Sequence, residues 1–204
     1  YTGINGQFKG EQLELLPAIE TTFAMWKKMY PESMVAQFGT GLERYPNFQR
    51  DSYSDPDRFG TYPYSDYRTN DGYFIAPLTT GTPDLATYFA KEVVTGVCIG
   101  EAVRAYPYAD MAPAAVINDT LGGEQLLVIF DLESRTSIPY RRSVDGQLLS
   151  FYQVETESDL PVEFRDVETG SRWNMLGRAV SGPLAGSQLE QLPAYNSMWF
   201  AWST

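Results

Sequence analysis

The same sequence pattern occurs twice in this chain of 204 residues. Residues 6–26 read GQFKGEQLELLPAIETTFAMW and residues 182–202 read GPLAGSQLEQLPAYNSMWFAW, and the two align without a gap at a constant offset, 182 − 6 = 176. Both glycines, the QLE and LPA triplets and the final tryptophan are identical. We call these the first and second repeat stretches. An offset of domain length indicates the duplication of a whole unit rather than a solenoid of short repeats.

The duplication predicts three regions along the chain. Residues 1–35 would be the C-terminal tail of a preceding repeat unit, and residues 73–204 would be the second unit. Residues 36–72 between them are rich in Tyr, Asp and Gly and show no sustained periodicity, which is typical of a long ordered loop. The body of the first unit is therefore expected before Tyr1.

The composition is that of a globular protein, with 43% hydrophobic and 14% aromatic residues. A formal net charge of −11 argues against nucleic acid as a partner, because phosphate binding depends on clustered Lys and Arg. No run of apolar residues is long enough for a transmembrane segment. We therefore expect a protein without a transmembrane segment in this chain.

The segment after residue 90 consists of short apolar stretches separated by turn residues. Hairpins are predicted across Gly100-Glu101, Gly122-Gly123, Asp145-Gly146 and the ETG triplet at 168–170. This spacing predicts a mainly β fold, a β-rich α+β class in which an antiparallel sandwich or barrel carries a few short helices, as part of an internally duplicated fold.

Three short helices are predicted beside the strands. Phe23, Trp26 and Tyr30 recur at helical spacing, so a helix over residues 21–29 should bury these aromatic side chains. The same helix should recur at 196–202 with Asn196 or Ser197 as its N-cap. A further helix is expected at 84–90, after Pro83.

The chain offers little catalytic chemistry. It has no His, which is the commonest general base and metal ligand, and its single Cys98 lies in the apolar run VVTGVCIG, where it is expected to be buried. Zinc and copper sites draw on His and Cys, and a serine triad needs a His. We therefore expect no catalytic residue, no metal and no cofactor.

Several motifs carry a family resemblance: GEAVRAYPY at 100–108, INDTLGG at 117–123, LLVIFD at 126–131 and FRDVETGSRWNMLGRAVSGPLAG at 164–186. In these the chain resembles the bacterial and archaeal family of domains of unknown function numbered 3179. The resemblance implies an extracytoplasmic location, whether periplasmic, secreted or lipid-anchored. Family members carry Trp-His before the Asn-Asp of this segment, and Cys-Pro-Leu-Cys or Cys-Pro-Leu-Thr after the next strand. Here the positions before Asn118 read Met-Ala-Pro-Ala-Ala at 111–115, and the positions after the strand read Asp-Leu-Glu-Ser at 131–134, so these Trp, His and Cys residues are missing.

Six polar or aromatic residues match or flank the motif positions and are candidates for a residual pocket. They are Asn118, Asp119, Arg141, Arg165, Glu168 and Trp173. Bonding within turns and pairing on the surface account for the same residue types in many proteins, so this pattern indicates a candidate site without naming a reaction.

The leading hypothesis is a non-catalytic structural or interaction domain of a secreted or periplasmic protein. One alternative is the scaffold half of a metal-binding or thiol-dependent enzyme whose active unit lies before Tyr1. Another is a module that binds carbohydrate or peptide through exposed Tyr and Trp. The partner is expected to be another protein subunit or the upstream unit, because the apolar residues of the first repeat stretch need a surface to cover them.

Overall fold

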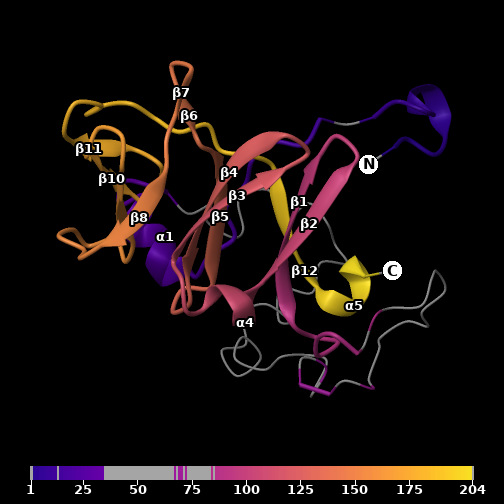
Figure 1. The fold of residues 1–204 in the computed structure, drawn as a ribbon. Helices are drawn as coiled ribbons and strands as arrows, with labels where there is room; N and C mark the ends of the chain where they lie inside the picture. The colour runs from indigo at the N-terminus through magenta and orange to yellow at the C-terminus, as the bar shows by residue number, and fades with distance from the viewer. Residues whose placement is uncertain are drawn as a thin grey trace.

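The computed structural model describes residues 2–12, 14–34, 67, 69–70, 72, 84 and 86–203. Within these residues the chain forms antiparallel β-sheets and a few short helices (Figure 1). The predicted β-rich fold class is therefore confirmed. Of the two expected architectures the layered one is observed, since no sheet among the described strands closes into a barrel. The loop expected at 36–72 lies almost entirely outside the described residues.

The described strands form sheets in the orders β12-β1-β2, β3-β4-β5, β11-β10-β9-β8 and β6-β7. The strands are β1 (Val93–Ile99), β2 (Ala102–Pro107), β3 (Val116–Leu121), β4 (Glu124–Asp131), β5 (Thr136–Arg141), β6 (Ser143–Val144), β7 (Gln147–Leu148), β8 (Phe151–Val154), β9 (Glu163–Asp166), β10 (Arg172–Asn174), β11 (Ala179–Ser181) and β12 (Ala194–Met198). The helices are η1 (Gly6–Phe8), α1 (Phe23–Met29), α4 (Tyr108–Met111) and α5 (Trp199–Trp202).

Strand β4 separates two hydrophobic cores. Its side chains alternate between the two faces of the β3-β4-β5 sheet, as the period of two in a strand requires. Leu127 and Ile129 join the core shared with β5 and the β8–β11 sheet, whereas Leu126, Val128 and Phe130 join the core shared with β1, β2 and α4. All five are at most 2% exposed. A strand buried on both faces reads as an unbroken apolar run, which is how β4 appears in the sequence.

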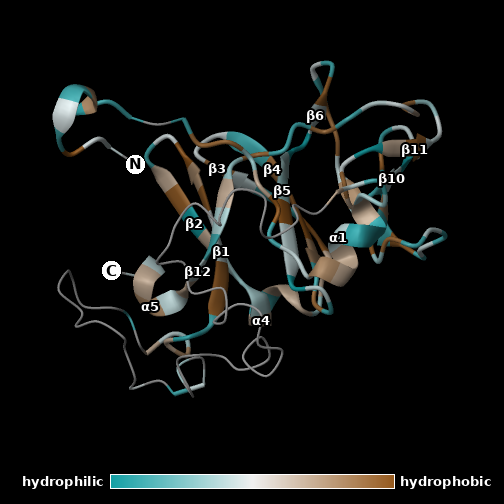
Figure 2. Ribbon diagram, turned by 180° about the vertical axis from the view of Figure 1, so that it is seen from behind, coloured by the Kyte–Doolittle hydropathy of each residue, from teal (hydrophilic) through white to brown (hydrophobic). Residues whose placement is uncertain are grey.

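The predicted hairpins are present at all four turns. At the tip of the β6-β7 hairpin, Asp145 and Gly146 both have positive φ, 50° and 81°, the geometry of a two-residue type I′ turn. In Figure 2 much of β1, which lines one of the two cores, carries the hydrophobic colour.

The two repeat stretches share one local structure, a small hairpin. We call residues 2–12 the first hairpin and residues 178–188 the second hairpin. Four backbone hydrogen bonds and one β-bridge recur at the offset of 176. The amide-to-carbonyl pairs Gly3–Glu11, Lys9–Gly6, Gly10–Gly3 and Glu11–Phe8 recur as Ala179–Ser187, Ala185–Gly182, Gly186–Ala179 and Ser187–Leu184, and the bridge Thr2–Gln12 recurs as Arg178–Gln188.

The environments of the two hairpins differ. Leu189 and Leu192, which directly follow the second hairpin, are 1% and 4% exposed. Leu16, which aligns with Leu192, is 74% exposed, and the first hairpin projects away from the body of the protein in Figure 1. The same sequence pattern therefore gives the same conformation in a packed and in an unpacked setting.

Helix α1 forms where the sequence predicts it, but it buries a different face. The Thr22 side chain caps it by accepting a hydrogen bond from the Met25 amide at 3.3 Å. The prediction that Phe23, Trp26 and Tyr30 are buried is wrong, because all three are exposed. Met25 and Met29, one turn apart, instead join the core around β5. Both stripes have helical spacing, so spacing alone does not choose between them.

The predicted helix at 196–202 is wrong in its N-terminal half. Residues 194–198 form β12, which pairs with β1, and α5 begins only at Trp199, the residue that aligns with Phe23 at the start of α1. β1 supplies hydrogen-bond partners to this segment, so extended structure replaces the first helical turn. The helix expected at 84–90 is also wrong in its described part, since residues 86–90 form turns.

Cys98 is exposed, contrary to the prediction that it is buried. It is the penultimate residue of β1, where side chains alternate between the core and the outer face. Val97 points into the core, and Cys98 points away from it, opposite the 60% exposed Val103 of β2. An apolar run is typical of a strand buried on both faces, but only one face of this strand end is covered.

The two hairpins yield a matched pair of substitutions. Gly6 and Gly182 both have positive φ, 71° and 95°, but a Cβ at Gly182 would lie 2.6 Å from the Cα of Ser171, whereas nothing lies within 4 Å of one at Gly6. We expect Gly182→Ala to lower the free energy of unfolding by more than about 2 kcal/mol, through strain plus a clash. Gly6→Ala strains only an exposed hairpin and should change it by less than about 1 kcal/mol. Chemical denaturation of both variants measures this, and equal losses would contradict it.

Candidate functional site

Two of the six candidate residues hold the start of β8. Asn118 on β3 donates from Nδ2 to the Phe151 carbonyl at 2.7 Å and accepts at Oδ1 from the Phe151 amide at 2.9 Å. Its side chain thus bonds to β8 as a neighbouring strand would. Glu168 accepts a hydrogen bond from the Ser150 amide at 2.8 Å, one residue earlier. Both side chains therefore have backbone partners in the fold.

Asp119, the next residue on β3, faces β2. Its Oδ2 accepts hydrogen bonds from the Tyr106 hydroxyl at 2.8 Å and from the Arg104 guanidinium, and its Oδ1 accepts one from the Thr120 amide at 2.7 Å. Burial acts to raise the pKa of Asp119, but these three donors outweigh it and hold the pKa below its ordinary value. The carboxylate is therefore ionised at neutral pH and serves as an acceptor between two strands.

The remaining three candidates lie elsewhere. Arg141 at the end of β5 binds the carboxylates of Glu190, at 3.0 Å, and Glu124. Arg165 donates to the Gly170 carbonyl at 3.4 Å.

Trp173, the last of the six candidate residues, is fully buried, and its indole N–H donates to Asp166 at 2.9 Å. The structure brings Asn118 and Glu168 together at β8 and Arg165 and Trp173 together in the β9-β10 hairpin. None of the six candidates lines either of the two hollows described next.

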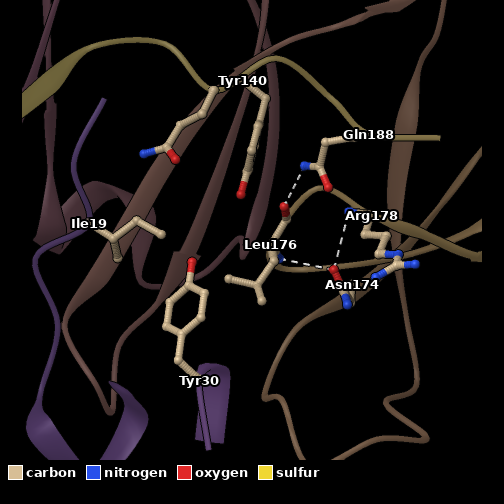
Figure 3. Close-up of a pocket in the computed structure, with 8 residues that line it drawn as sticks. Ile19, Tyr30, Tyr140, Asn174, Leu176, Arg178 and Gln188 are labelled. Atoms are coloured by element: carbon tan, nitrogen blue, oxygen red, sulfur yellow. Dashed lines mark hydrogen bonds between the residues drawn. The ribbon is translucent and has the colours of Figure 1, made fainter. Parts of the chain in front are cut away.

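A hollow of about 380 Å³ lies between the end of α1 and the second hairpin. We call it the tyrosine hollow. Figure 3 shows the hydroxyl groups of Tyr30 and Tyr140 directed toward each other across it, with Ile19 and Leu176 on its two sides. Its polar lining consists of Asn174, Arg178, Gln188 and Gln191. The residues of this hollow come from both repeat stretches, from β5, from the C-cap of α1 and from residues 174–178.

Hydrogen bonds to the backbone fix the orientation of its three amides. Asn174 Oδ1 accepts from the amides of Leu176 and Arg178 at 3.1 and 3.2 Å, which leaves its Nδ2 as a donor. Gln188 Nε2 donates to the Leu176 carbonyl at 2.8 Å, and Gln191 Nε2 donates to the Ala18 carbonyl at 3.2 Å. The Oε1 atoms of both glutamines remain as acceptors without a partner among the described residues.

The hydroxyl groups of Tyr30 and Tyr140 complete the polar lining of the tyrosine hollow. Tyr140 donates its hydroxyl to the Met175 carbonyl at 2.9 Å, and burial, followed by the neighbouring Tyr30, raises the pKa of Tyr140. Its hydroxyl is therefore protonated at neutral pH and can still accept one hydrogen bond. The hollow thus offers a mixed set of oriented donors and acceptors with one guanidinium and no carboxylate.

A second hollow, of about 600 Å³, is lined in part by Ser134, at the end of the turn at 131–134, and by Arg135. The Ser134 amide donates to Asp131 Oδ2 at 2.8 Å. Hydroxyl contacts then run from Ser134 to Thr136 at 2.7 Å and from Thr136 to Thr21 at 2.6 Å, so the first repeat stretch is tied to this turn. Among the described residues no three His, Cys, Asp or Glu side chains gather as a metal site would require.

The first repeat stretch and the residues on either side of it, 2–34, carry an exposed apolar surface, which we call the apolar arm. Of the 16 exposed large hydrophobic residues in the described part of the chain, eight fall within residues 2–34. They are Ile4, Phe8, Leu15, Leu16, Phe23, Trp26, Tyr30 and Met34. Such a concentration in one short segment is typical of a surface that another molecule covers.

Sequence reasoning missed the residues of the tyrosine hollow. Gln188 and Gln191 read as surface polar residues of the second repeat stretch, and Tyr30 reads as a core residue of the first. Only the docking of α1 onto the β5 core brings Tyr30 to Tyr140, which is 110 residues later (140 − 30). The shared Gln12/Gln188 position was the one available signal.

The fold and these surfaces define a layered antiparallel β protein with a polar hollow and an exposed apolar arm. The chain belongs to the family described as "Protein of unknown function (DUF3179)", whose model matches residues 1–204. No curated protein and no solved structure matches it. None of the described helices has the length and apolar character that crossing a bilayer demands.

The Asp119 cluster gives a pH-dependent prediction. Asp119→Asn removes the charge that Arg104 and Tyr106 share, so the free energy of unfolding at pH 7 should fall by about 1 kcal/mol. Because the folded pKa lies below the ordinary value of 3.8, this contribution is present above that pH and is lost as the pH falls through the folded pKa. Denaturation from pH 7 to pH 2 should show the wild type and the variant converging in acid. Asp145→Asn, at the exposed β6-β7 turn, is the control; a constant difference at all pH values would contradict the prediction.

Proposed function

We propose that this chain is a non-catalytic structural or interaction domain and that a partner protein covers its apolar arm. The observation that carries the proposal is the contrast between the repeat stretches. Leu192 is 4% exposed and its aligned residue Leu16 is 74% exposed, although the hairpins before them have the same hydrogen bonds. Burying one such side chain is worth roughly 1.5–3 kcal/mol, so a partner that covers several of them gains a substantial driving force.

The hydrogen bonds and ion pairs of the candidate polar residues support a role without catalysis. Asn118, Asp119, Glu168 and Arg141 are each engaged by a backbone group or a charged side chain of the fold. Reactive groups need perturbed pKa values beside an open site, but the two candidates with shifted pKa values are held in their charged forms. Asp119 is ionised between two strands, and the hydrogen bond to Glu124 raises the pKa of Arg141.

The proposal includes the division of the chain into repeat units. Residues 1–35 would be the tail of one unit, residues 36–72 a connecting loop and residues 73–204 the next unit, and the partner would be another subunit or the rest of the first unit. The recurring hairpin bonds support this division. The family resemblance supports an extracytoplasmic location.

The alternative of a scaffold for a metal-binding or thiol-dependent enzyme rests on the resemblance alone. At the turn where that resemblance places cysteines, the chain carries Asp131 and Ser134, which bond to each other, and Ser134 also contacts the Thr136 hydroxyl. This alternative would assign the chemistry to a different unit and leave the present one as its support.

The tyrosine hollow favours a second candidate function, binding of a small polyhydroxylated ligand such as a sugar. Each sugar hydroxyl both donates and accepts, and the hollow presents oriented groups of both kinds beside two tyrosine rings. Its volume of about 380 Å³ lies within the range of small-molecule sites. The absence of a carboxylate from this lining suits a neutral or anionic ligand.

Association of the purified chain tests the leading proposal. We expect the wild type to self-associate weakly or to bind a hydrophobic dye, because its apolar arm is uncovered. Leu16→Asp should remove most of this behaviour without changing the melting temperature, since Leu16 is 74% exposed. Analytical ultracentrifugation and dye fluorescence measure both. Val103→Asp, at a 60% exposed residue outside the arm, is the control. A strictly monomeric chain that binds no dye would refute the proposal.

Titration with neutral monosaccharides and disaccharides, followed by calorimetry, tests the second candidate. Tyr30→Phe removes one hydroxyl from the hollow and keeps the ring, so binding of any sugar that occupies it should weaken about threefold to tenfold. Tyr152→Phe, at an exposed tyrosine on β8, is the matched control and should leave binding unchanged. Equal effects of the two substitutions, or no heat with any sugar at millimolar concentration, would exclude the hollow as a sugar site.

A further inference from the structure

The second repeat stretch shows how a domain of this fold covers such a stretch. After the second hairpin the chain runs along β5. The Leu192 amide donates to the Pro139 carbonyl at 2.9 Å, and the Arg141 amide donates to the Glu190 carbonyl at 2.9 Å. Gln191 forms a β-bridge with Tyr140 between them. Residues 190–192 therefore add to β5 as a short extra strand.

Apolar side chains follow the same docking. Leu189 enters the core of β5 and the β8–β11 sheet, and Leu192 enters the core of β1 and β2. At the end of the stretch the ring of Trp202 lies on Gly96 of β1, where a Cβ would stand only 2.1 Å from it. A glycine at this point of β1 makes room for the tryptophan.

The first repeat stretch has the same features and no such cover. Residues 14–16 align with residues 190–192 and make no backbone hydrogen bond to another described residue. Leu16 aligns with Leu192, and Trp26, which is 36% exposed, aligns with Trp202. Phe8, 60% exposed, aligns with Leu184, which is partly buried against the β5 core.

The uncovered surface continues directly from a covered one. Met25 and Met29 of α1 lie in the β5 core, the Ala18 carbonyl accepts from Gln191, and the Thr21 and Thr136 hydroxyls are 2.6 Å apart. The first repeat stretch is thus anchored on the present domain by one side, and α1 turns its other side, with Phe23 and Trp26, to solvent.

We propose that the apolar arm is covered by a second domain of this same family, docked in the register that the second hairpin uses. In this arrangement the partner's counterpart of β5 pairs with residues 14–16 and receives Leu16. The partner's counterpart of Gly96 receives Trp26. The first repeat stretch then lies between two like domains, with its methionines in one and its leucines and tryptophan in the other. This inference rests on the proposed interaction function and names its partner.

A graft within the full chain tests the register. Residues 178–192 are replaced by residues 2–16, TGINGQFKGEQLELL, so that the first hairpin must dock on this domain's own β5. If the first hairpin is built for a domain of this fold, the graft should keep one cooperative thermal transition, lowered by less than about 10 °C. The amide of residue 192 should keep its protection in hydrogen exchange, because its bond to Pro139 is retained.

Two further variants provide reference values for the melting temperature of the graft. Leu189→Asp in the wild-type background places a charge in the core and should lower the melting temperature by more than about 10 °C. A smaller graft, Leu184→Phe with Gln191→Leu, changes only two positions that differ between the stretches: Leu184, which packs against the β5 core, and Gln191, which bridges to Tyr140. If both grafts melt as low as Leu189→Asp and lose protection at residue 192, the inference is overturned; if either keeps both properties, it stands.

Negative results in the graft experiment and in the association experiment refute different proposals. A wild-type chain that neither associates nor binds dye refutes the interaction function, whatever the graft does. A chain whose arm associates through Leu16, but whose hairpin cannot replace residues 178–192, has a partner of a different fold.

Discussion

The alternation of side chains along β4 is the constraint on which the rest of the structure depends. Leu127 and Ile129 face one core while Leu126, Val128 and Phe130 face the other, so one strand forms the wall between two apolar volumes. The β12-β1-β2 sheet can cover one face of the central sheet and the β8–β11 sheet the other only because β4 is apolar on both faces. A polar residue at any of these positions would open one core to an unpaired polar group, at a cost of several kcal/mol.

The repeat stretches separate what local sequence determines from what packing adds. The hairpin with its two positive-φ glycines forms both where it packs against the domain and where it does not, since its four recurring bonds lie within the hairpin itself. The residues after it differ. Residues 194–198 are a strand because β1 lies beside them, whereas residues 18–22 are not, and both stretches return to helix at aligned positions, Phe23 and Trp199. Extended structure needs a partner strand, and a helical turn does not.

The tyrosine hollow arises where the end of α1 meets the second repeat stretch. Helix α1 is held by Met25 and Met29, and this docking creates the tyrosine hollow behind Tyr30 and leaves Trp26 outside. Polar residues singled out in the family motifs instead join strands: Asn118 bonds to β8, Asp119 to β2 and Trp173 to Asp166. The groups that remain open to a ligand or partner therefore lie on residues 2–34 and on the residues that these contact. The motif residues instead join the strands that support this region.

The sequence by itself determined the β class, the four hairpin turns and the presence of a helix at α1, because turn residues and strand periodicity act over a few residues. It did not determine which stripe of α1 is buried, that Cys98 faces solvent, or that Ser197 lies in a strand. Each of these depends on which surface lies opposite: the methionines meet the β5 core, the outer face at the end of β1 is uncovered, and β12 has β1 beside it. Only the tertiary structure decided them, because two faces of one element can have the same periodicity while only one of them meets a partner.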